Sequence, residues 1–67
     1  MRNAKFTALG LAVKVKLLEK GLTQEDLIKG IKKETGLFID SGYLYKILTG
    51  KRSPEKIIAS IKRILDL

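Results

Sequence analysis

Residues 21–52 read GLTQEDLIKGIKKETGLFIDSGYLYKILTGKR, and this stretch decides the fold that the sequence predicts. It contains two short helical patterns, and each pattern ends at a glycine, the residue that most often closes a helix. Thr23 precedes the first pattern and Asp40 precedes the second, and both are residue types that cap helix N-termini. The stretch therefore predicts a helix-turn-helix whose recognition helix spans residues 41–49.

One helix is expected on each side of this pair. Thr7 suits the N-cap of a helix over residues 8–20. At the other end, Ser53 is a capping residue and Pro54 stands at the first helical position, where its missing N–H is harmless. The prediction is a single all-α domain over residues 1–67, a compact four- to five-helix bundle with residues 1–6 as a flexible arm.

The first helix carries two apolar stripes on nearly opposite sides. One stripe consists of Leu9, Val13 and Leu17, and the other of Leu11, Val15 and Leu18. One apolar face normally suffices for packing against a core. We expect the C-terminal helix to cover the second stripe, and the alternative is a surface for a second subunit.

Smaller features divide the rest of the chain. The alternation in residues 37–40 predicts that Leu37 and Ile39 pack under the turn and that Phe38 stays partly exposed. Gly30 costs about 1 kcal/mol relative to alanine inside a helix. Either it permits close approach of another helix, or it has no structural role.

The composition argues against an enzyme. A chain of 67 residues has little room for an internal active-site cavity. It contains neither cysteine nor histidine, so thiolate chemistry, disulfides and the commonest general base and metal ligand are absent. We expect no catalytic residue, no cofactor and no metal site. No apolar run is long enough to span a membrane, which predicts a cytoplasmic protein.

The charge is concentrated at both ends of the chain. The net charge of +7 divides into +4 for residues 1–22, −1 for residues 23–40 and +4 for residues 41–67. A polyanion such as nucleic acid suits this distribution, because neutralising phosphates releases counterions. A merely solubilising surface explains the charge equally well, so other features must decide between them.

The outward side of the predicted recognition helix supplies those features. A helix that enters the major groove needs small or polar groups near its N-terminus and donors that reach base edges. The expected base-reading residues are Ser41, Gly42, Tyr43, Tyr45 and Lys46. A purely structural role for Tyr43 is an equal alternative. The expected phosphate-binding residues are Thr23, Gln24, Thr49, Lys51 and Arg52.

The segments GLTQEDLIKGI and SGYLYKILTGKRSP resemble the lambda-repressor-like, Xre/Cro-type helix-turn-helix family of bacterial and phage transcriptional regulators. The resemblance covers residues 7–65 and implies that a helix from Gln24 positions the recognition helix from Ser41. It also implies a protein associated with the bacterial nucleoid. The segment IKKETGLFIDS is about half a dozen residues longer than the family usually has between these helices. The lengthened turn is similar to a subset from phages and mobile elements, and it leaves individual base contacts open.

The resulting expectation is a sequence-specific regulator that binds double-stranded DNA, without catalysis. A homodimer on an inverted-repeat operator is a hypothesis motivated by the second apolar stripe. The alternatives are a protein-interaction module, such as an antirepressor or antitoxin-like partner, and an excisionase-like protein that bends DNA. A membrane-surface role for the basic C-terminal helix is disfavoured, because its apolar stripe is needed for the core.

Overall fold

A computed structural model describes residues 5–67, and it confirms an all-α protein of four helices with no strand in that range. The helices are α1 (Ala8–Lys20), α2 (Gln24–Thr35), α3 (Ser41–Leu48) and α4 (Glu55–Leu65). The first four residues of the predicted arm lie outside the described residues. Phe6, which was also assigned to the arm, packs against the core.

Three predicted N-caps are confirmed, each by a backbone N–H that donates to the capping side chain. The Thr7 hydroxyl accepts from Gly10 at 3.0 Å, and the Asp40 carboxylate accepts from Tyr43 at 2.8 Å. At Thr23 the contact is reciprocal: its hydroxyl accepts from Asp26 N–H, and the Asp26 carboxylate accepts from Thr23 N–H. These local bonds satisfy N–H groups that have no partner within their helices.

The predicted start of the last helix was wrong. The helix begins at Glu55, Pro54 is its N-cap residue, and no side chain caps it. The backbone of Pro54 is extended, with ψ of 114°, so the first helical turn starts one residue later than expected. Ser53 therefore lies one position too far from the free N–H groups to serve as the cap.

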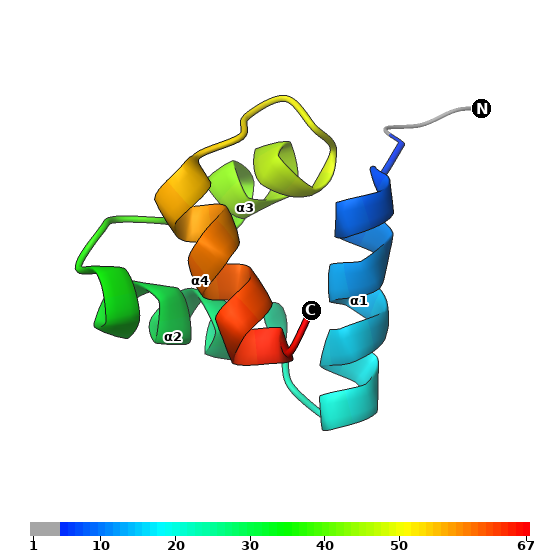
Figure 1. The fold of residues 1–67 in the computed structure, drawn as a ribbon, viewed down its shortest axis with the longest axis horizontal. Helices are drawn as coiled ribbons and strands as arrows, with labels where there is room; N and C mark the ends of the chain where they lie inside the picture. The colour runs from blue at the N-terminus through cyan, green and yellow to red at the C-terminus, as the bar shows by residue number, and fades with distance from the viewer. Residues whose placement is uncertain (1–4) are drawn as a thin grey trace.

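The four helices enclose one core (Figure 1). α4 packs across α2 and also contacts α1, while α3 packs against α1 and α2. The core is built almost entirely from aliphatic side chains, which are Val13, Leu17, Leu27, Ile28, Ile31, Ile39, Leu44, Ile47, Leu48, Ile57, Ile61 and Leu65. Their burial is the main stabilising contribution in a chain without disulfides.

α1 and α3 meet at the Leu48 carbonyl, near the C-terminal end of α3. This oxygen accepts hydrogen bonds from the N–H of Thr7 at 3.0 Å and from its hydroxyl at 3.1 Å. Gly10, one turn into α1, lies so close that an added Cβ would overlap the same carbonyl. Donors at the N-terminus of α1 thus satisfy a carbonyl group at the C-terminal end of α3. The close approach of the two helices requires a residue without a side chain at position 10.

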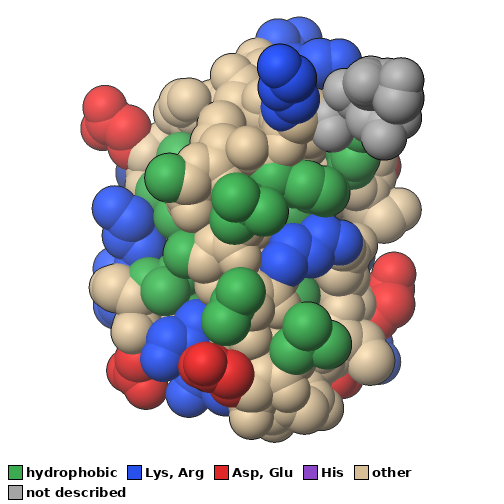
Figure 2. Space-filling view, turned by 90° about the vertical axis from the view of Figure 1, so that its right-hand side faces the viewer, with side chains coloured by type: hydrophobic (Ala, Val, Ile, Leu, Met, Phe, Trp, Pro, Cys, Tyr) green, Lys and Arg blue, Asp and Glu red, His purple; other side chains and the backbone are tan. Residues whose placement is uncertain are grey.

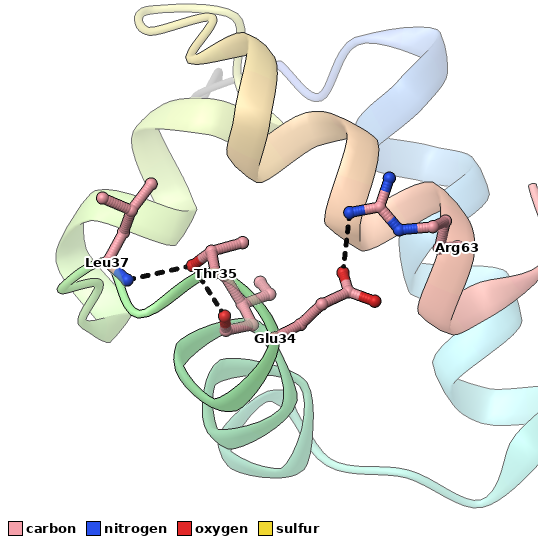
Figure 3. Close-up of polar contacts among 5 residues, drawn as sticks. Glu34, Thr35, Leu37 and Arg63 are labelled. Atoms are coloured by element: carbon pink, nitrogen blue, oxygen red, sulfur yellow. Dashed lines mark hydrogen bonds and ion pairs between the residues drawn. The ribbon is translucent and has the colours of Figure 1, made fainter.

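α2 and α4 are joined by apolar packing and by a surface ion pair. A Cβ added at Gly30 would lie 3.2 Å from Cδ1 of Ile64, so this glycine does permit a close approach of α4. Arg63 on α4 contacts Glu34 on α2 at 3.0 Å (Figure 3). Beside this pair, the Thr35 hydroxyl donates to the Ile31 carbonyl and accepts from Leu37 N–H, which closes the end of α2.

Two predictions of burial were wrong. α4 does not cover the second stripe of α1: Leu11, Val15 and Leu18 are 56%, 51% and 83% exposed. The core side of α1 instead faces both α3 and α4, which leaves the opposite side free. In the connector, Ile39 is buried and Phe38 is exposed as expected, but Leu37 is also exposed and lines a surface groove beside α3.

None of the described helices has the length and apolar character that crossing a membrane requires.

Candidate nucleic-acid interface

The outward side of α3 carries most of the residues that the sequence predicts for base reading. Leu44, Ile47 and Leu48 are buried, and their burial fixes the rotation of the helix about its axis. Ser41, Gly42, Tyr45 and Lys46 consequently lie exposed on the other side. On this exposed side the first turn of α3 presents the Ser41 hydroxyl and the bare backbone of Gly42, so another molecule can approach it closely.

A basic cluster, defined here as Lys46, Lys51 and Arg52, forms at the end of α3. The chain folds back after Gly50, which adopts a positive φ of 83°. The N–H groups of Lys51 and Arg52 both donate to the Lys46 carbonyl, at 2.8 and 3.3 Å. This turn holds the three basic residues next to one another, and all three are exposed. Three cations with no described acidic ion-pair partner suit a polyanion.

The two tyrosines of α3 have different surroundings. Tyr43 is half-buried and packs against the core, which is the position expected if its role is structural rather than base reading. Tyr45 is exposed, and its ring meets the edge of Phe6 with the centroids 6.2 Å apart. The Lys14 ammonium lies 5.2 Å from the centroid of the same Phe6 ring. Phe6 therefore positions Tyr45 and brings a further cation from α1 close to the outward side of α3.

Acidic and hydroxyl groups limit which parts of this surface can take a phosphate. Asp40 accepts the N–H of Tyr43 and places a negative charge at the N-terminus of α3. That end of the helix is consequently better suited to base edges than to phosphate. Thr49 donates its hydroxyl proton to the Tyr45 carbonyl at 2.9 Å, so a phosphate contact by this hydroxyl requires the bond to break.

A surface groove of about 710 Å³ adjoins the N-terminal half of α3. Its walls come from the connector, from α3 and from the start of α4. They include the exposed Phe38 and the half-buried Tyr43, while Gly42 and Lys46 form the edge shared with the outward side of α3. The groove thus adds apolar surface beside the polar residues of the candidate interface.

Thr23 and Gln24 lie apart from the basic cluster. They start α2 beside the C-terminal end of α1, whereas α3 packs at the N-terminal end of α1 (Figure 1). The Thr23 N–H is occupied by Asp26, and this hydrogen bond lowers the pKa of the Asp26 carboxyl. A charged carboxylate at this helix start disfavours a phosphate there. The structure thus separates these two residues from the other predicted contacts.

Phe6 and Lys14 were missed as members of this surface. Phe6 directly precedes the Thr7 cap, and an apolar residue at that position commonly packs against the structure that follows. That signal was present in the sequence. The place of Lys14 follows only from the packing of α1 on α3, which no local pattern reveals.

Comparisons with protein-family models, with curated proteins and with solved structures found no significant match.

Proposed function

We propose that the protein is a sequence-specific regulator of the Cro or repressor type that inserts α3 into the major groove of double-stranded DNA. The observation that carries the proposal is the pairing of Gly42 and Ser41 at the exposed start of α3 with Lys46 one turn later. The small residues let the helix backbone approach the bases, and the lysine is long enough to reach guanine O6 and N7. Regulation follows from occupancy, because bound protein excludes or recruits polymerase.

The basic cluster supplies the expected backbone contacts. Lys51 and Arg52 follow α3 directly and are held by hydrogen bonds to the Lys46 carbonyl. In this arrangement they reach the phosphates that border the groove while Lys46 faces a base pair. Phosphate contacts fix the position of the protein on the duplex, and base contacts provide the sequence preference. Thr23 and Gln24 are not needed for this mode of binding.

Selection of bound duplexes from a randomised DNA pool tests the proposal directly. The selection should be performed near physiological salt, where the sequence-independent electrostatic attraction is weakened. We expect enrichment of a defined sequence. Enrichment of an inverted repeat identifies an operator for two copies of the chain.

The alternatives make different predictions in the same assay. A protein-interaction module gives no enrichment and retains no duplex at that salt concentration. An architectural protein retains duplexes of many sequences and bends them, which circular-permutation electrophoresis detects. Either result would replace the regulator proposal.

A further inference from the structure

The outward face of α1 is apolar, although it belongs to a small and highly charged protein. Figure 2 looks onto this side of the molecule and shows several hydrophobic side chains along it, with a Lys or Arg side chain among them. Leu18 is the most exposed large hydrophobic residue in the described chain, and Leu11 and Val15 lie within two turns of it. No described part of the same chain covers them. Apolar patches on the surface of a small protein are often functional, and many of them bind another protein.

The spacing on this face is that of a coiled-coil seam. Ala8, Leu11, Val15 and Leu18 are separated by three, four and three residues, so they occupy successive a, d, a and d positions. Valine at a and leucine at d is the combination that favours two parallel helices. The core residues Val13 and Leu17 lie on the opposite side of α1, so pairing along the seam leaves the fold intact.

The charges beside the seam fit a second copy of the same helix in one direction. In this register Lys14 is at g and Glu19 is at the following e position, on opposite sides of the seam. Parallel helices bring each g residue near the e residue of the partner, so two Lys14–Glu19 pairs form across the twofold axis. Antiparallel helices bring Lys14 near the other Lys14 instead. The present contacts of the two residues, with Phe6 and Lys16, lie at the surface and are weak enough to be exchanged.

The parallel direction also suits the proposed DNA contact. The C-terminal end of α3 is hydrogen-bonded to Thr7, which precedes α1, so the basic cluster lies at the N-terminal end of α1 (Figure 1). A parallel pair places both basic clusters at the same end of the dimer, where one duplex can reach both. An antiparallel pair places them at opposite ends.

We infer that a second copy of this chain packs on the outward face of α1 in a parallel helix pair with a seam formed by Leu11, Val15 and Leu18. The inference concerns the free protein and stands separately from the proposed DNA binding. α1 has 13 residues and is therefore only about 20 Å long, so the interface is smaller than that of a stable dimer. We expect a dissociation constant on the order of micromolar to millimolar.

Sedimentation of the DNA-free protein over concentrations up to about 1 mM, the upper limit of that range, tests for association. We expect a monomer–dimer equilibrium that weakens at least about tenfold for Leu18→Gln, because both copies lose the contact. Phe38→Gln is the matched control, since it removes an exposed large apolar side chain from the connector. Monomeric wild-type protein at the highest concentration, or equal weakening by both variants, would overturn the inference.

Cysteine cross-linking tests the direction of the helices, and the absence of native cysteine makes an introduced thiol a unique reporter. A parallel pair brings the two Leu18→Cys thiols within disulfide distance, so this variant should oxidise to a covalent dimer. If a mixture of Leu11→Cys and Leu18→Cys chains forms disulfides mainly between the two different variants, the helices pack antiparallel and the inference is contradicted. Failure of DNA selection alongside efficient Leu18→Cys cross-linking would reject only the proposed function.

Discussion

α1 and α3 each have one buried side and one outward side, but their outward sides differ in chemistry. α3 presents polar, small and basic groups, including Ser41 and Lys46, whereas α1 presents Leu11, Val15 and Leu18. Polar groups keep their hydration until a polar partner replaces it, and exposed aliphatic groups gain from any apolar cover. This difference in chemistry is the reason that we propose different partners for the two helices, a polyanion for α3 and a second copy of the chain for α1.

Gly10→Ala disrupts the contact between these two helices, and it should have the largest effect on the stability of the fold. The new Cβ overlaps the Leu48 carbonyl, a backbone group that cannot move without displacing the end of α3. We expect a loss of about 3 kcal/mol or more in the free energy of unfolding, well above the helix-propensity gain of about 1 kcal/mol. Urea denaturation followed by circular dichroism measures the loss.

Gly30→Ala is the matched control for this prediction. Its Cβ meets the end of the Ile64 side chain, which can change its position. The gain in helix propensity should then offset most of the steric cost, and the net change should stay within about 1 kcal/mol. A similar loss in the free energy of unfolding for both variants would show that the contact with the Leu48 carbonyl does not determine the cost of Gly10→Ala.

A pair of valines on α1 sharpens the comparison of its two sides. Val13 is fully buried and Val15 is half exposed. Val13→Ala removes two buried methyl groups and leaves a cavity, so we expect a loss of about 2 kcal/mol in the free energy of unfolding. Val15→Ala should change the stability of the monomer by no more than about 0.5 kcal/mol. Thermal and urea unfolding at low protein concentration compares the two, and equal losses would contradict the assigned orientation of α1.

The features that the sequence predicted correctly depend on neighbouring residues. Thr7, Thr23 and Asp40 cap helices through hydrogen bonds to N–H groups three positions later, so these contacts depend only on residues close together in the sequence. The helix ends at Gly21 and Gly36 follow from the same local rule, and both glycines adopt positive φ.

The failures concern packing between distant parts of the chain. Periodicity identified both apolar stripes of α1, but it contains no information about which stripe α4 meets. The same distinction applies to the candidate interface. The spacing of apolar residues in α3 predicted which residues face outward. The distance of Thr23 and Gln24 from Lys51 depends instead on how the helices are arranged in space, which the local sequence does not reveal. The Ser53 error has a different origin, because both Ser53 and Pro54 are compatible with a helix start and the backbone of Pro54 decides between them.

The outward side of α3 is tested by comparing two basic residues. Lys46→Ala should weaken binding to the selected DNA by about 1 to 3 kcal/mol and relax the preference at one base pair. Arg52→Ala should weaken all sequences alike and reduce the slope of log affinity against log salt by about one. Fluorescence anisotropy with cognate and random duplexes separates these effects.

Lys33→Ala is the control for charge, because it removes one positive charge from an exposed position on α2. If this variant weakens binding as much as Lys46→Ala, net charge rather than α3 determines the affinity. Equal effects of Lys46→Ala on cognate and random DNA would reject its role in base recognition.

The smallest effect is expected away from both outward faces, at the ion pair between Glu34 and Arg63. The Arg63 guanidinium donates to the Glu34 carboxylate and lowers its pKa below the usual value near 4.5. A carboxyl group whose pKa is lower in the folded state stabilises the fold above its unfolded pKa, and this contribution is lost as the pH falls through the folded pKa. Glu34→Gln should therefore lower the urea midpoint slightly at pH 7, because exposed ion pairs contribute little. The difference from wild type should disappear well below pH 4.5. A difference that persists in acid would show that Glu34 supports the α2–α4 contact through packing rather than charge.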